Sequence, residues 1–172
     1  MRRFGVIVAL GALLGMFTGV VTASPALAGR GPKWELLQAE PFTISAVDCG
    51  FEINAVPVAN EYQKVLKASD GSIIFLATGS LKVSLTNAQT GKTITENASG
   101  PSKTTAFPDG SVAFASRGHT LAFFPSALAQ QFGLPPVSVT AGQLNGAFDS
   151  DGNLTALSLG GHVLVDVCAA LS

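Results

Sequence analysis

The chain has 172 residues, of which 10 are basic and 11 acidic, so that 12% carry a charge. This is half of what an ordinary soluble domain carries, roughly 25%. Such a balanced and charge-poor composition argues against a polybasic nucleic-acid-binding protein and against an acidic disordered chain, but it names no function.

The first 28 residues have the pattern of an export signal. Arg2 and Arg3 precede the apolar residues 4–21, and residues 24–28, SPALA, end in the small-x-small pattern that signal peptidase recognises. We therefore expect residues 1–28 to be a cleaved signal peptide of bacterial type and the mature protein to be secreted. An uncleaved membrane anchor of about 20 apolar residues is the alternative.

Residues 29–172 have the length of one domain, which we expect to be a secreted β-domain without a membrane span. A chain of this size buries about two thirds of its unfolded surface, so its core requires no metal or cofactor, and none is expected. Removal of Arg2 and Arg3 leaves 8 basic against 11 acidic residues. This slight negative charge gives no electrostatic reason to expect nucleic acid or an anionic membrane as a partner.

Apolar residues alternate with small or polar ones along much of the mature chain, which predicts half-buried strands. Leu81, Val83 and Leu85, for example, alternate with Ser, Lys and Thr residues. The expected strands lie at residues 50–58, 60–69, 72–86, 92–99, 102–107, 111–117, 119–124, 137–148 and 153–168. We expect the long strands to bend at Gly79, Gly142 and Gly160.

Turn sequences separate these strands: Asp70-Gly71, Thr90-Gly91, Pro108-Asp109-Gly110 and Asp151-Gly152-Asn153. Glycine at these positions supplies the positive φ that tight hairpin turns require. The meander predicts an all-β fold, a single antiparallel β-barrel of about eight strands of the lipocalin-like kind, because closure removes open sheet edges. A β-sandwich of two sheets is the alternative.

One segment interrupts the strand pattern. Residues 125–136, PSALAQQFGLPP, predict a single helical turn between Ser126, a candidate N-cap, and Gly133, a candidate C′ residue. In a barrel this connection would either cover a mouth or cross one end and fill it with Leu128 and Phe132.

Cys49 and Cys168 are the two cysteines of the chain. In an exported protein an even pair is expected to be oxidised, so we predict a disulfide that ties the first and last strands together. A metal site and a catalytic thiol are the alternatives. Neither has local support, because the chain has no Cys-x-x-Cys motif and no cluster of histidine or acidic residues surrounds Cys49.

Characteristic turn and edge sequences occur along nearly the whole mature chain: Glu61-Tyr62-Gln63, Asp70-Gly71, Thr86-Asn87, Thr90-Gly91-Lys92, Ser99-Gly100-Pro101, Pro108-Asp109-Gly110 and Asp166-Val167-Cys168-Ala169-Ala170-Leu171. Together they resemble a family of small secreted bacterial proteins of unknown function. The resemblance implies a barrel similar to that of allene oxide cyclase and dirigent proteins. It implies no catalytic residues, because no active-site motif of those enzymes has matching positions here.

Few residues are available for acid–base chemistry, since the chain has two histidines. His119 and Arg117 stand at a strand start, where they either terminate a hairpin or line a barrel mouth. With Glu61, Tyr62 and Phe123 they are the candidates for a cavity or its mouth. The sequence contains no catalytic motif that identifies an enzyme.

The mature chain retains nine of the eleven phenylalanines but one tryptophan and one tyrosine. This balance argues against a sugar-binding surface, which favours rings with polar edges. The first hypothesis is therefore a secreted barrel that binds a small apolar ligand. The alternatives are a barrel isomerase or cyclase that acts on a lipid-like substrate through Glu61, Tyr62, Arg117 and His119, and a packed extracellular module that contacts another protein.

Overall fold

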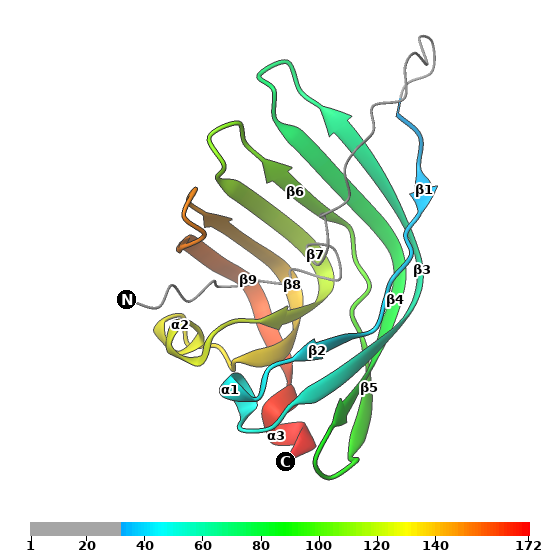
Figure 1. Ribbon diagram of the computed structural model, residues 1–172, viewed down its shortest axis with the longest axis vertical. Helices are drawn as coiled ribbons and strands as arrows, with labels where there is room; N and C mark the ends of the chain where they lie inside the picture. The colour runs from blue at the N-terminus through cyan, green and yellow to red at the C-terminus, as the bar shows by residue number, and fades with distance from the viewer. Residues whose placement is uncertain (1–31) are drawn as a thin grey trace.

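The computed structural model describes residues 32–172, and within this range the chain is all-β, as predicted. Nine strands form one antiparallel sheet, accompanied by three short helices (Figure 1). The predicted signal peptide and its cleavage site lie outside the described residues. None of the helices between residues 32 and 172 is long and apolar enough to cross a membrane.

The elements follow one another in the order β1 (Glu35–Leu36), β2 (Phe42–Ile44), α1 (Ala46–Cys49), β3 (Ile53–Lys67), β4 (Ile73–Asn87), β5 (Thr93–Asn97), β6 (Ser102–Ala106), β7 (Val112–Phe123), α2 (Ser126–Gln131), β8 (Val137–Phe148), β9 (Leu154–Asp166) and α3 (Val167–Leu171). Two pairs of expected strands are single strands in the structure. Residues 50–58 and 60–69 merge into β3, and residues 111–117 and 119–124 merge into β7. The reason is that the residues between them, Ala59 and Gly118, continue the pairing, with Leu81 and Gly142 respectively.

The predicted turns between the long strands are confirmed, and aspartates stabilise three of them. The Asp70 carboxylate accepts the Ser72 amide at 2.9 Å, and the Asp109 carboxylate accepts the Ser111 hydroxyl at 2.6 Å. These bonds favour the charged form, so the Ser72 amide lowers the pKa of Asp70 and the Ser111 hydroxyl lowers that of Asp109. The third such aspartate, Asp149, belongs to the β8–β9 turn, where the Asn153 side chain lowers its pKa in the same way.

The sheet is not closed, so the predicted barrel is not confirmed. The strand order is β1-β3-β4-β6-β7-β8-β9, with β2 paired to β3 and β5 paired to β4. Among the described residues β9 pairs with β8 alone, while the outer edge of β3 is taken by β2 at one end and β1 at the other. A strand that would close a barrel along β3 therefore finds both of these stretches of the edge occupied. The nine strands still form one sheet and not the two of a sandwich.

The sheet bends along a row of glycines that lie side by side on neighbouring strands. Gly118 pairs with Gly142, and Gly142 pairs with Gly161. Gly100, between β5 and β6, lies beside Gly118. Strands β5 and β6 pair with β4 in the same register, and this register places Gly100 opposite Gly79. Figure 1 shows the long strands curving along their length.

These positions require glycine because the neighbouring backbones approach closely. A Cβ on Gly142 would lie 2.5 Å from the Gly160 carbonyl oxygen, and Gly79 and Gly142 both have positive φ, 139° and 113°. At both positions, where bends were predicted, the backbone departs from an ordinary strand conformation. On β9 the residue in the row is Gly161 and not the predicted Gly160, because the hairpin register places Gly161 opposite Gly142.

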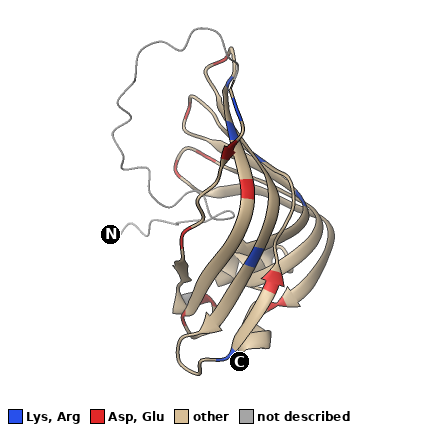
Figure 2. Ribbon diagram, turned by 90° about the vertical axis from the view of Figure 1, so that its right-hand side faces the viewer, with Lys and Arg blue, Asp and Glu red and all other residues tan. Residues whose placement is uncertain are grey.

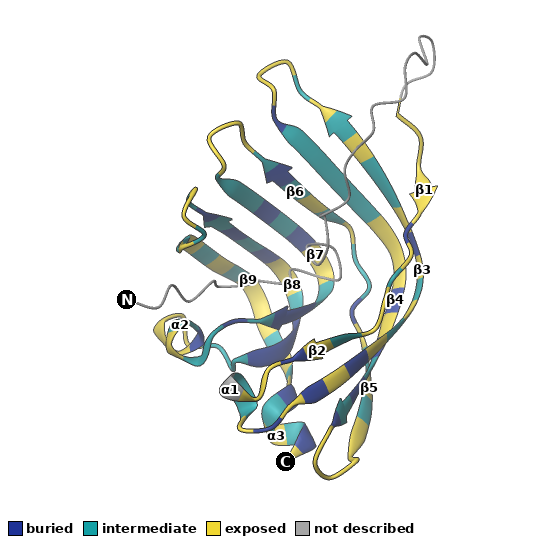
Figure 3. Cartoon of the chain, in the orientation of Figure 1, coloured by how far each residue is buried: buried dark blue, intermediate teal, exposed yellow. Residues whose placement is uncertain are grey.

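The buried apolar side chains form two clusters. The first joins β3, β4, β7 and β8 to α3 and includes Ile53, Leu85, Val139 and Leu171. Along β3, buried and exposed residues alternate as expected for a strand with one covered face (Figure 3). The second cluster lies on β7, β8 and α2, and in it the rings of Phe114 and Phe148 stack with centroids 5.9 Å apart.

Helix α2 confirms the helical turn predicted after Pro125, and Gly133 follows it with a φ of 65°. Two details differ. The Ser126 hydroxyl does not cap the helix, because it donates to the backbone oxygen of Asp48. The fully buried residue is Ala129, whereas Phe132, at the C-cap, is 37% exposed.

Candidate functional site

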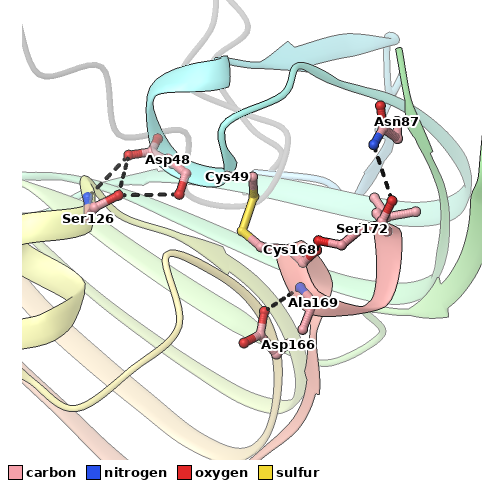
Figure 4. The surroundings of a disulfide bond; sticks show 9 residues. Asp48, Cys49, Asn87, Ser126, Asp166, Cys168, Ala169 and Ser172 are labelled. Carbon is pink, nitrogen blue, oxygen red and sulfur yellow. Dashed lines mark hydrogen bonds between the residues drawn. A yellow bond between two sulfur atoms is a disulfide. The ribbon is translucent and has the colours of Figure 1, made fainter. Parts of the chain in front are cut away.

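The predicted disulfide is present between Cys49 and Cys168, whose Cα atoms lie 5.2 Å apart (Figure 4). It joins the short helices α1 and α3, and not the first and last strands themselves, because each cysteine belongs to the helix beside the strand. The Asp166 carboxylate caps α3 by accepting the Ala169 amide at 3.0 Å. The Asn87 side chain donates to the backbone oxygen of Leu171 at 3.1 Å.

These bonds join several segments at one end of the molecule. In addition to the disulfide, the Asp48 carboxylate of α1 accepts the backbone amide of Ser126 at the start of α2. Segments 78 and 119 residues apart in sequence are thus held together. No group of three or more His, Cys, Asp or Glu side chains that could hold a metal ion occurs between residues 32 and 172.

A partly enclosed pocket of about 70 Å³ lies at the bend of the sheet, on the side of the first core cluster. Its apolar lining includes Leu37, Phe42, Leu81, Val83, Leu121 and Phe123. Its polar lining consists of Glu61, Ser102, Ser116, His119 and Thr120. The pocket thus has apolar walls and a small set of converging polar groups, which is the usual composition of a small-molecule site.

Three of the five candidate residues meet in this pocket, namely Glu61, His119 and Phe123. Tyr62 does not, because it follows Glu61 directly in β3 and its side chain, 44% exposed, lies on the other face of the strand. Arg117 is exposed beside Gly118 and does not line the pocket either. The sequence did not indicate that Glu61 is buried, because the large apolar residues of this part of β3, Val56 and Val58, lie on the opposite, exposed face.

Glu61 is the most unusual of these residues. Its side chain is 6% exposed and lies in the inward row of β3, together with Ile53 and Ala55. Gly79 stands opposite it, and a Cβ there would come 2.7 Å from the Glu61 Cα atom. Within residues 32–172 the Glu61 carboxyl has no hydrogen-bond or ion-pair partner. Burial consequently raises the pKa of Glu61, because water is withdrawn from the charged form.

Sequence reasoning missed several residues that complete the pocket. Phe42 stacks on Phe123 with centroids 6.0 Å apart, and it comes from the short strand β2, which has no strong strand pattern. The Ser116 and Thr120 hydroxyls lie 2.9 Å from each other. Residues of both parities in β7 line the pocket, among them the neighbours Thr120 and Leu121, and close to them Gly118 has a φ of 86°.

Charged residues are spread thinly over the strands in the view of Figure 2, without a large patch of one sign. Comparison of the chain with models of known protein families, with curated proteins and with solved structures finds no match. The resemblance to a family of secreted proteins therefore stays a prediction, and the geometry of the pocket is what bears on function.

Proposed function

We propose that the protein is an exported binding protein that takes a small, mainly apolar molecule into the pocket at the bend of its sheet. The observation that carries this proposal is the composition of that pocket. Apolar side chains from β2, β3, β4 and β7 surround a space of about 70 Å³ beside the core. Burial of apolar ligand surface in such a space provides the binding energy.

The volume limits what can bind. A space of 70 Å³ holds roughly five water-sized groups, and a drug-sized ligand would need a considerably larger cleft. The ligand is therefore either a molecule of a few non-hydrogen atoms or the end of a longer one whose remainder stays outside the pocket.

The disulfide supports action outside the reducing cytosol. Cys49 and Cys168 are bonded to each other, as is usual for proteins of oxidising compartments. Together with the signal-like first 28 residues, this bond supports secretion by bacterial-type export as the second part of the proposal.

The test is to purify the protein from the culture medium and to examine it by native mass spectrometry for a bound small molecule. Thermal shifts with a panel of short-chain alcohols, amines and acids supply the second readout. Ala98→Leu should abolish the shifts, because Ala98 is buried and lines the pocket. The control is Ala88→Leu in the exposed β4–β5 turn, which should retain them. A ligand-free mass combined with no shift from any compound would refute the proposal.

A second candidate function rests on one observation. Glu61 and His119 line the same pocket, and both side chains can transfer protons. In this alternative the protein is an isomerase or cyclase that holds a lipid-like substrate between them. Incubation with a lipid extract of the producing cells, followed by mass spectrometry, should then show a product that forms with the wild type and not with His119→Gln. Identical lipid profiles for the two proteins would exclude this alternative.

A further inference from the structure

We propose that the ligand of the pocket carries an ammonium group that binds the Glu61 carboxylate, so that the ligand class is small alkyl amines or the amine ends of longer molecules. This inference rests on the proposed binding function and specifies its ligand.

The first argument is the isolation of Glu61. The Glu61 residue is 6% exposed, so a charged carboxylate there keeps less hydration than one on the surface, and such a group is normally paired or hydrogen-bonded. Glu61 has no partner within residues 32–172, although its side chain lines the pocket. A positively charged ligand would supply the missing partner.

Residues 32–172 place no lysine or arginine in the lining of the pocket. Arg117 is exposed beside the bend, and Lys82 is exposed on β4, next to the inward-facing Leu81. His119 lines the pocket but forms no ion pair with Glu61. The carboxylate therefore faces the pocket without competition from a side chain of the described region.

The surroundings of Glu61 also suit an ammonium group. The rings of Phe42 and Phe123 line the pocket, and aromatic rings are favourable neighbours for cations. An ammonium group has three N–H donors. The Glu61 carboxylate and the Ser102 hydroxyl, which also lines the pocket, are acceptors for them. An alkyl chain attached to the ammonium group would lie against Leu81 and Leu121.

The same geometry disfavours other head groups. A ligand carboxylate would face the Glu61 carboxylate as a like charge, and an alcohol would donate one hydrogen bond where an ammonium group donates three. Three probes of equal chain length therefore separate the possibilities: hexylamine, hexan-1-ol and hexanoate.

The experiment is an NMR titration of the ¹⁵N-labelled protein, purified with its disulfide intact, with each of the three probes. The amide signals of Ala98, Gly100 and Thr120 report on the pocket, since all three residues border it. We expect hexylamine to bind with a Kd lower than that of hexan-1-ol by about tenfold or more, as for hydrogen bonds to charged groups. Hexanoate should bind most weakly.

Glu61→Gln should remove the preference for hexylamine while it leaves hexan-1-ol binding in place. Glu52→Gln is the matched control, because Glu52 is exposed and lies outside the pocket. It should retain the full preference. The comparison of probes on the wild type needs no variant, so the proposal stays testable if Glu61→Gln fails to fold.

The outcomes are distinguishable. Equal binding of hexylamine and hexan-1-ol to the wild type, or tightest binding of hexanoate, would overturn the amine inference while it supports an apolar binding pocket. Preference for hexylamine that survives Glu61→Gln would also overturn it. If no probe shifts the pocket signals and native mass spectrometry finds no ligand, the proposed binding function itself fails.

Discussion

Two adjacent glycines on β9 should respond in opposite ways to replacement by alanine. Gly161 belongs to the glycine row, and a Cβ there would overlap the Ala141 carbonyl oxygen and come 2.9 Å from the Gly142 Cα atom. A Cβ on Gly160 would find its nearest neighbours, in Gln143, at 3.7 Å, an ordinary contact. The two substitutions add the same methyl group to the same strand, so the difference between them reports the close approach of β8 and β9 alone.

The size of the effect follows from the geometry. To accept Gly161→Ala, β8 and β9 must move apart locally by about 1 Å to restore ordinary contact distances. This stretches the neighbouring ladder hydrogen bonds, each of which contributes about 1 kcal/mol. With two or more bonds affected and the packing beside them disturbed, we expect a loss of about 2–4 kcal/mol. For a domain of this length such a loss lowers Tm by roughly 5–15 °C.

Gly160→Ala should leave the stability unchanged or raise it by about 0.4–1 kcal/mol, because alanine restricts the unfolded chain more than glycine does. The assay is thermal unfolding of wild type and both variants, followed by circular dichroism with the disulfide intact. If the Tm of Gly161→Ala lies within about 2 °C of that of Gly160→Ala, then β8 and β9 do not approach each other closely at Gly161.

Three further predictions concern the disulfide, the cap of α3 and the pocket. The double substitution Cys49→Ser, Cys168→Ser should lower the free energy of unfolding by up to about 4–5 kcal/mol, the loop-entropy limit for a closure of this length. Urea titration measures this loss, and a loss below about 1 kcal/mol would contradict the entropic role of the disulfide. Asp166→Ala should cost about 1 kcal/mol by removing the cap of α3 in the same assay, whereas Asp151→Ala, in an exposed turn, should cost much less. Because burial raises the pKa of Glu61, the wild type should be most stable, relative to Glu61→Gln, below the ordinary carboxyl pKa of about 4.3 and should lose that advantage as pH rises through the raised folded-state value. Urea titrations over this pH range measure the difference in free energy of unfolding between the wild type and Glu61→Gln. A difference that did not change with pH would show that the Glu61 carboxyl is hydrated in the folded protein.

Local features of the fold were readable from the sequence because they depend on neighbouring residues. Alternation along one strand decides which side chains share a face, so the strands from Ile73 to Asn87 and from Val137 to Phe148 were placed within a residue. The turns contain their own stabilising groups: the Asp149 carboxylate, for example, accepts the Asn153 amide at 2.8 Å. The disulfide followed from a count, since two cysteines allow a single intramolecular bond.

Features that join distant segments were decided by the tertiary structure. Closure of a barrel depends on whether β9 reaches β3, and the short strands β1 and β2 pair with two stretches of that edge instead. Their two and three residues carry too little pattern to be recognised in the sequence.

In the pocket, too, the sequence indicated some of the residues and the tertiary structure decided which of them come together. The sequence placed Glu61 and His119 among the candidates, but it also proposed Tyr62 and Arg117, which the structure leaves outside the pocket. Inward or outward orientation follows from local alternation only where a strand is regular, and Gly118 interrupts that regularity in β7. Strand register brings Glu61 opposite Gly79 and continues the glycine row as far as Gly161. Because register is a property of paired strands, no single segment of the sequence determines that Glu61 becomes a buried residue at the bend of the sheet, without a partner among residues 32–172.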